Sequence, residues 1–277
     1  TGWFINDQEV RVEGEHGSLR FKFDACIIAT GAEARPVAGL PCDSQNVLTP
    51  EHALALPELP TSLSISGDDY IALELATLYA RLGVQIKLYA SGDQLLPGTD
   101  LAALRLVQTG MRKQGIVINT GVKPTDIIER PLIISSGVKP RVTGLHLDAA
   151  GLEINANGGI AVDNQQRTSQ PQIFAAGDCI GNLPALANYA MKQGKVAAEV
   201  IAGQRVQFAP YALPQVVHTT PEIATVGYTA EEAVQMGATI NNGRFPLAAN
   251  GRALTLGTDN ATAQIIASTD GTLLGAT

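Results

Sequence analysis

The segment that most constrains the fold is T-S-Q-P-Q-I-F-A-A-G-D, which occupies residues 168–178. Its short apolar run, Ile173 to Ala176, predicts a buried strand, and Gly177 and Asp178 follow that strand directly. Open α/β folds bind ligands beyond the carboxyl ends of their strands. A glycine there lets a ligand approach the backbone, and a carboxylate accepts a hydrogen bond from a hydroxyl group. The segment therefore predicts an α/β protein with a ligand at this strand end.

An earlier segment has the same character. The sequence F-D-A-C-I-I-A-T-G spans residues 23–31. Its run from Cys26 to Ala29 predicts a strand that is buried on both faces. Ala29, Thr30 and Gly31 then predict a tight turn without bulky side chains.

The two segments together resemble the FAD-binding motifs of the pyridine nucleotide-disulfide oxidoreductases. This resemblance implies an α/β chain with Rossmann-like FAD- and NAD(P)-binding domains, followed by a partial α+β dimerisation domain. A helix is expected from Leu186 to Ile201, and in the family its first N–H groups face the flavin. The FAD-contacting residues implied by the resemblance are Ala29, Thr30, Gly31, Gly177, Asp178, Leu186, Ala187 and Asn188.

A strand–helix–strand unit opens at residue 63. The sequence predicts a strand over 63–66, a helix over 70–82 closed by Gly83, and a strand over 84–89. By resemblance this is the nicotinamide-binding unit, with Gly67, Asp69, Tyr70, Ile71, Ala90 and Gly137 at the positions that would contact NAD(P)H.

Several of these positions depart from the family pattern. In G-x-G-x-x-G the middle glycine lets the pyrophosphate approach the backbone, and here that position is Asp69. The acidic residue that would bind a ribose is replaced by Ala90, and the family's arginine after Gly137 is Val138. Only about a dozen residues stand where the family has an antiparallel meander of three strands, too few for that structure. The nicotinamide-domain fold is expected, but the departures argue against binding of the dinucleotide.

Two further residues are candidates for chemistry. Glu74 matches a glutamate that lies near the flavin in the disulfide reductases, and the alternative is an ordinary helix glutamate. His218 is expected to be a strand residue rather than a catalyst, because a catalytic histidine needs an orienting carboxylate that the sequence does not reveal.

The last part of the chain resembles the interface domain of the same family. Residues 220–227, T-P-E-I-A-T-V-G, and residues 245–253, F-P-L-A-A-N-G-R-A, are most like the dihydrolipoyl dehydrogenases. These enzymes pass electrons from dihydrolipoyl groups through a cysteine pair and FAD to NAD. The resemblance implies a homodimer and, as possible partners, components of 2-oxo acid dehydrogenase complexes. Alternatives are a mercuric reductase-, glutathione reductase- or transhydrogenase-like member, and a non-catalytic, degenerate paralogue that serves as a dimerisation scaffold.

Charge and cysteine usage limit the remaining possibilities. A net charge of −7 without long charge runs gives no indication of nucleic-acid binding. No apolar run is long enough for a membrane span, and the three cysteines suggest a reducing cytoplasm rather than a disulfide framework. No metal site is expected.

The resemblance also assigns four segments to domains. They are a partial FAD-binding domain (1–60), a degenerate NAD(P)-binding domain (61–143), the remainder of the FAD-binding domain (144–210) and a partial interface domain (211–277). The family's first G-x-G-x-x-G unit, its C-x-x-x-x-C pair and its C-terminal His–Glu pair have no counterpart in the sequence. The chain is therefore expected to be a fragment without lipoamide oxidation activity of its own.

Overall fold

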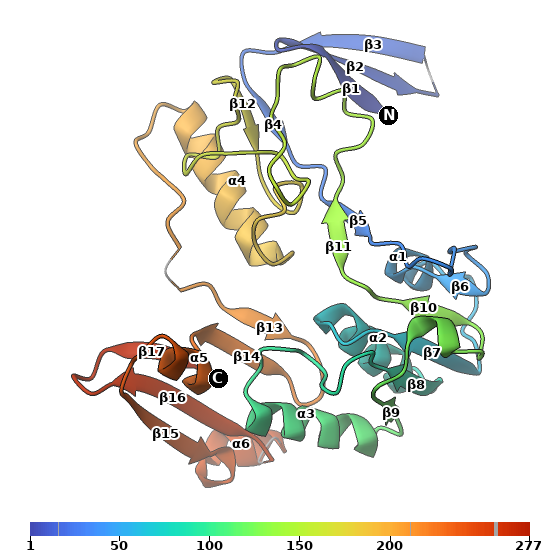
Figure 1. Cartoon of the computed structure of the whole chain (residues 1–277), viewed down its shortest axis with the longest axis vertical. Coiled ribbons are helices and arrows are strands. Elements are labelled where there is room, and N and C mark those ends of the chain that lie inside the picture. The colour runs from blue at the N-terminus through green and yellow to red at the C-terminus, as the bar shows by residue number, and fades with distance from the viewer. Residues whose placement is uncertain (16, 211, 258–259) are drawn as a thin grey trace. The chain divides into compact units, whose positions relative to one another are not determined.

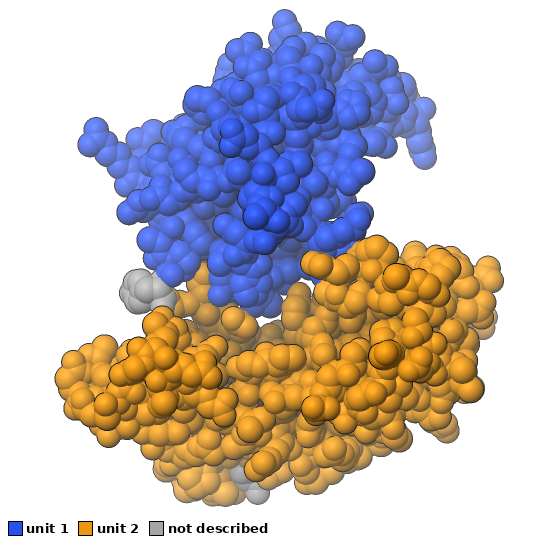
Figure 2. Space-filling model, in the orientation of Figure 1, with its two compact units in different colours: residues 1–33, 138–211 blue, residues 34–137, 212–277 orange. Residues whose placement is uncertain are grey.

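The computed structural model describes residues 1–277 except residues 16, 211 and 258–259 (Figure 1). Contacts within the chain define two compact units, coloured separately in Figure 2. Unit 1 comprises residues 1–33 and 138–211, and unit 2 comprises residues 34–137 and 212–277. The division into four domains by function stays a prediction.

Unit 1 begins with a small antiparallel sheet, as expected for residues 1–22, whose sequence alternates between polar and apolar side chains. Its strands are β1 (Gly2–Asn6), β2 (Glu9–Gly14) and β3 (Gly17–Lys22). Two later strands, β4 (Cys26–Ile28) and β12 (Ile173–Ala175), pair in parallel. Helix α4 (Ala187–Ile201) completes the set, and it begins one residue after the start expected from the sequence and ends where expected.

Strand β12 is the short apolar strand that its sequence predicts, and it is buried on both faces. Phe174 packs into a cluster with Val196 and Val200 of α4. Ile173 and Ala175 point the other way, into a second cluster. Burial on both faces is expected for β4 from its sequence, and this expectation is wrong, because Ile27 is 39% exposed. Among the described residues, β4 has only one neighbouring strand, β12.

Unit 2 contains the predicted strand–helix–strand unit within a parallel sheet of order β6-β10-β7-β8-β9. The strands are β6 (Val47–Leu48), β7 (Ser62–Ser66), β8 (Gln85–Tyr89), β9 (Val117–Asn119) and β10 (Leu132–Ile134). The helices are α1 (Pro50–Leu54), α2 (Tyr70–Arg81) and α3 (Leu101–Lys113). Ile65, Leu88 and Leu73 are fully buried in the main core of this unit.

Residues 32–60 are more structured than expected. The sequence predicts a linker with one helix near 51–56, and α1 is that helix. The segment also contains β5 (Ala32–Ala34), which pairs with β11 (Val138–Pro140), and the sheet strand β6. The Asp43 carboxylate accepts hydrogen bonds from three successive backbone N–H groups, ending with that of Val47. This loop turns Val47 and Leu48 into the sheet, where both are buried.

The meander of the family is absent, as the sequence predicts. Between β9 and β10 all residues are described, and they form one 3-10 turn, η1 (Pro124–Asp126), and no strand. Part of this connection covers the second face of the sheet, where Ile127 packs with Tyr89 and Leu132.

The rest of unit 2 is an antiparallel sheet of order β13-β14-β17-β16-β15. Its strands are β13 (Gln215–Val217), β14 (Ile223–Gly227), β15 (Ile240–Pro246), β16 (Thr262–Ser268) and β17 (Leu273–Ala276). Short helical segments are α5 (Ala230–Gln235), η2 (Leu247–Ala249) and α6 (Gly251–Leu256). The sequence T-A-E-E at residues 229–232 is typical of a capping box, and Thr229 and Glu232 form one at the start of α5. Over the described part of the chain, no helix has the length and apolarity needed to cross a membrane.

Candidate functional site

The glycine turn after β12 is fixed to helix α4. Gly177 has φ +81°, a conformation that L side chains rarely adopt. A Cβ atom at this position would lie 3.2 Å from the Cβ of Ala190. The N–H of Gly177 donates to Oε1 of Gln193 at 2.8 Å. The turn therefore approaches the helix closely and holds a fixed geometry.

Asp178, the next residue, carries a carboxylate without a partner in the described chain. It is half-buried, and burial raises the pKa of this carboxyl group. No described residue donates a hydrogen bond to its side chain. A half-buried acceptor of this kind suits a hydroxyl group of a ligand.

The turn after β4 lies at the same edge, because β4 and β12 are parallel neighbours. The N–H of Ala176 donates to the carbonyl of Ile28 at 3.0 Å. Thr30 donates from Oγ1 to the carbonyl of Arg141 at 2.7 Å, and Gly31 has φ +70°. The structure thus places the 29–31 and 177–178 segments at neighbouring strand ends.

Helix α4 begins without the usual side-chain cap. Its N-cap residue is Leu186, which makes no side-chain hydrogen bond to the first turn, and Ala187 follows exposed. The Asn188 side chain accepts a hydrogen bond from the N–H of Tyr189 at 3.1 Å. By contrast, α2 and α3 begin with Asp69 and Asp100, whose carboxylates bind first-turn N–H groups. The positive end of the α4 dipole therefore has no carboxylate cap of its own.

Gln193 is a functional candidate that sequence reasoning missed. It is buried within α4, and its carbonyl oxygen holds the Gly177 turn. The sequence contained a signal for it, because Gln193 lies on the same helix face as the apolar residues Val196, Ala197 and Val200. A glutamine on a buried helix face needs a hydrogen-bond partner.

The turn after β7 forms a second candidate site, within unit 2. Gly67 precedes it, and Tyr70 and Ile71 begin α2 with partly buried side chains. Asp69 is the N-cap, and its Oδ1 accepts from the N–H of Ala72 at 2.9 Å. Ser135, at the end of β10, donates from Oγ to the same carboxylate.

Two other residues that the resemblance implies for this site lie at neighbouring strand ends. Ala90, directly after β8, is fully buried. Gly137 has φ +78° in the turn after β10, and its carbonyl accepts from the N–H of Arg35.

His218 lies just outside strand β13, so the expectation that it is a strand residue is wrong. Glu222 is 2.8 Å from its Nδ1 atom. Glu74 Oε1 accepts from the backbone N–H of His218, also at 2.8 Å. The hydrogen bond to Glu222 raises the pKa of His218, and the charges of Glu74 and Glu222 act in the same direction. Glu74 thus joins α2 to the segment after β13, and neither contact was visible in the sequence.

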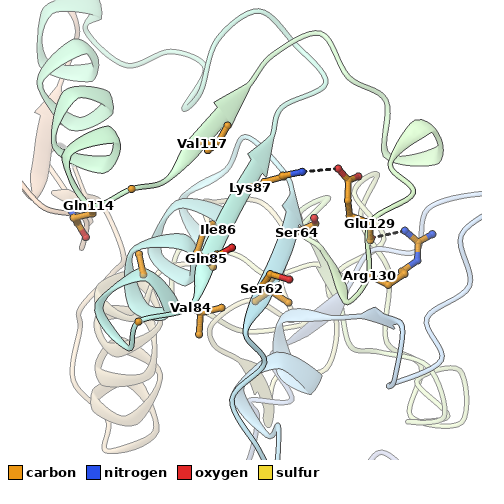
Figure 3. A pocket seen from close by; sticks show the side chains of 14 residues that line it. Ser62, Ser64, Val84, Gln85, Ile86, Lys87, Gln114, Val117, Glu129 and Arg130 are labelled. Carbon is orange, nitrogen blue, oxygen red and sulfur yellow. Dashed lines mark hydrogen bonds and ion pairs between the residues drawn. The ribbon is translucent and has the colours of Figure 1, made fainter.

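A pocket of about 460 Å³ lies at the opposite, amino edge of the parallel sheet (Figure 3). Ser62 and Gln85, the first residues of β7 and β8, line it. Glu129 accepts hydrogen bonds from Lys87 and from the Tyr89 hydroxyl, each at 3.0 Å. Because α/β folds bind nucleotides at the carboxyl edge, this pocket is in the wrong place for the predicted cofactors.

The Glu129 contacts predict a pH-dependent contribution to stability. The hydrogen bond from Lys87, and that from Tyr89, lower the pKa of Glu129 from an ordinary 4.5 to about 2. A carboxyl group whose pKa is lowered in the folded state stabilises the fold at pH values above its ordinary pKa. This stabilisation is lost as the pH falls towards 2. We expect Glu129→Gln to lower the melting temperature near neutral pH, with the difference from the unsubstituted chain vanishing near pH 2.

Thermal unfolding across this pH range checks the prediction. Glu58→Gln, which changes an exposed carboxylate of the same unit, is the matched control and should have little effect at any pH. A Glu129→Gln difference that persists unchanged at the acidic end would show that the stabilisation is not electrostatic.

Comparison with known proteins agrees with this geometry. A family model described as pyridine nucleotide-disulphide oxidoreductase matches residues 2–194. The chain belongs to this family. The model of the family's dimerisation domain matches residues 213–277, the antiparallel sheet of unit 2.

Curated relatives carry the name dihydrolipoyl dehydrogenase. The protein from Bacillus subtilis (strain 168) is 37% identical over 298 positions, which cover 99% of this chain and 63% of the relative. The protein from Pseudomonas aeruginosa is 34% identical, with 99% and 62% covered. The chain thus spans less than two thirds of the length of these relatives. The 298 aligned positions exceed its 277 residues, so the Bacillus protein has residues within the matched region that this chain lacks.

Solved structures show the same fold. The HOCl-induced flavoprotein disulfide reductase RclA from Escherichia coli superposes with a TM-score of 0.89 at 26% identity, covering 100% of this chain and 67% of that one. LpdA from Mycobacterium tuberculosis gives a TM-score of 0.88 at 24% identity, covering 99% and 65%. Within the described residues, no cluster of three potential metal ligands occurs.

Proposed function

We propose that the protein of which this chain is part is an FAD-dependent oxidoreductase of the dihydrolipoyl dehydrogenase type. Its reaction would transfer electrons between a dithiol or disulfide and a nicotinamide dinucleotide. The observation that carries the proposal is the edge formed by β4, β12 and the start of α4. There a glycine turn, the unpartnered Asp178 carboxylate and a helix end without a side-chain cap come together.

These residues suit the flavin cofactor, and each has a defined part. Asp178 would accept a hydrogen bond from a ribityl or ribose hydroxyl. Gly31 and Gly177 would leave room for the cofactor beside the backbone. The N-terminus of α4, at Leu186 to Asn188, would stabilise negative charge on the reduced ring through its dipole. FAD, when bound, supplies the electron-carrying chemistry.

The dithiol substrate, the partners and the location follow from the relatives and from composition. The dimerisation domain supports a homodimer. A role beside components of a 2-oxo acid dehydrogenase complex is proposed from the resemblance to dihydrolipoyl dehydrogenases, and a cytoplasmic location is proposed from the sparse cysteines. Mercuric reductase-, glutathione reductase- or transhydrogenase-like activity remains an alternative within the same family.

A second candidate function is a non-catalytic paralogue. The contact between Asp69 and Ser135 favours it, because these residues do not fit a nicotinamide dinucleotide at the second site. In that case the chain would serve as a dimer partner, and the flavin edge would be a remnant of the enzyme.

Titration of the purified chain with FAD tests the proposal, with the quenching of flavin fluorescence as the measure of binding. Saturable binding of FAD, and also of riboflavin, which lacks the adenosine diphosphate part but keeps the ribityl chain and the ring, supports the flavin site. Absence of saturable FAD binding by the folded chain would contradict it.

A further inference from the structure

We propose that Asp69 and Ser135 close the phosphate position of the second dinucleotide domain, and that they exclude a nicotinamide dinucleotide from this chain. The inference rests on the proposed function for the role of this strand–helix–strand unit. It favours the second candidate function, because a chain that excludes the dinucleotide cannot itself pass electrons to it. According to this inference, the two residues determine which cofactor the chain can bind.

Asp69 places a negatively charged side chain at the N-terminus of α2. Its Oδ1 atom accepts from the N–H of Ala72 at 2.9 Å, so the carboxylate lies against the first turn of the helix. This is the place where helix N-termini bind phosphate groups, through free N–H groups and the positive end of the dipole. The Asp69 carboxylate occupies a first-turn N–H group and lies at the positive end of the dipole itself. Its negative charge also repels an incoming pyrophosphate.

Ser135 holds the carboxylate in that position from the end of the neighbouring strand, β10. Its Oγ atom lies 2.7 Å from Oδ1 and 2.9 Å from Oδ2 of Asp69, so the hydroxyl can donate to either oxygen. The Ser135 N–H donates to the carbonyl of Ser66 at 2.8 Å, which fixes the residue beside the end of β7. Ser135 is buried, with 5% of its surface exposed. Rotation of Asp69 away from the helix would therefore break this partly buried hydrogen bond.

The remaining glycine of the motif serves the chain's own packing. A Cβ atom at Gly67 would lie 2.5 Å from the carbonyl oxygen of Ser135 and 2.9 Å from the Cβ of Ala72. A side chain at position 67 would thus collide with the strand end and the helix, without any ligand present. The presence of Gly67 therefore does not indicate that a dinucleotide approaches the turn.

The adenosine end of the site is closed as well. Ala90 has no exposed surface. Its N–H donates to the carbonyl of Asn119 at 2.8 Å, and its carbonyl accepts from the N–H of Val122 at 3.1 Å. The position that would present a carboxylate to a ribose is thus a buried methyl group with both backbone groups in use.

Titration of the FAD-free chain with NADH, measured by calorimetry or by the nicotinamide fluorescence, tests the inference. The variants are Asp69→Gly, Ser135→Ala and the double variant. Glycine is well accepted at N-cap positions, so the fold should survive, and thermal unfolding checks this. Asp68→Ala is the matched control, because it removes a charge from the same turn and leaves the Asp69–Ser135 contact in place.

We expect no NADH binding below about millimolar concentration for the unsubstituted chain, Ser135→Ala and Asp68→Ala. Removal of the Asp69 charge should strengthen binding by about tenfold or more, to a similar extent in Asp69→Gly and in the double variant, because Ser135 acts through the Asp69 carboxylate. Binding by the unsubstituted chain at the strength of the double variant would overturn the inference. So would an equal gain in Asp68→Ala, or a folded double variant without any gain. FAD titration of the same samples reports on the flavin proposal separately.

Discussion

Replacement of Asp178 by alanine is expected to weaken FAD binding by about 10- to 100-fold, the effect of losing a hydrogen bond to a charged group. The physical reason is that this half-buried carboxylate has no donor among the described residues, so a ligand hydroxyl would be its partner. Its pKa is raised by burial, and a bound hydroxyl should lower the pKa again. FAD binding should therefore weaken as the pH falls and the carboxylate is protonated.

Fluorescence titration with FAD at several pH values checks both statements. Asp148→Ala, at an exposed carboxylate of the same unit, is the matched control and should bind FAD like the unsubstituted chain. Asp178→Asn retains a carbonyl acceptor, so its affinity for FAD should lie between that of Asp178→Ala and that of the unsubstituted chain. An Asp178→Ala variant with unchanged affinity would show that the carboxylate does not contact the cofactor.

Replacement by alanine is expected to have opposite effects on stability at two glycines that lie inside helices. Gly110 lies inside α3 and Gly194 inside α4. A Cβ atom at Gly110 would lie 2.1 Å from the carbonyl oxygen of Thr220, whereas one at Gly194 would find only the Cβ of Ala176, at 4.0 Å. Alanine is favoured over glycine in a helix interior by about 1 kcal/mol. Gly194→Ala should therefore stabilise the chain by about that amount.

Gly110→Ala should instead destabilise unit 2 by about 1–3 kcal/mol, because α3 and the 219–221 segment must move apart. Gln114 would lose part of its contact too, since its Nε2 donates to the same Thr220 carbonyl at 3.3 Å. Chemical denaturation of both variants measures the two effects. Equal stabilisation by both substitutions would mean that α3 does not pack against Thr220 as described.

Local patterns predicted much of the fold. The apolar runs at 63–66 and 84–89, and the helix between them, follow from periodicity and from the Gly83 stop, which act within a few residues. The same holds for the capping box of α5 and for strand β12. The loss of the meander could be predicted because chain length alone excludes three strands.

The remaining features depend on contacts between distant segments. Strand β6 has two residues, too few for any periodic signal, and it exists because β10 pairs with it. Ser135 reaches Asp69 across 66 positions, and Glu74 reaches His218 across 144. The sequence showed a carboxylate at Asp69 but not the serine that holds it.

The most direct test of the account is an absorbance measurement on the chain after incubation with FAD and removal of the free cofactor. The account predicts a yellow protein whose flavin is bleached by dithionite but not by NADH. Bleaching by NADH would contradict the closure of the second site by Asp69 and Ser135. A folded, colourless protein would contradict the flavin site at Gly177 and Asp178.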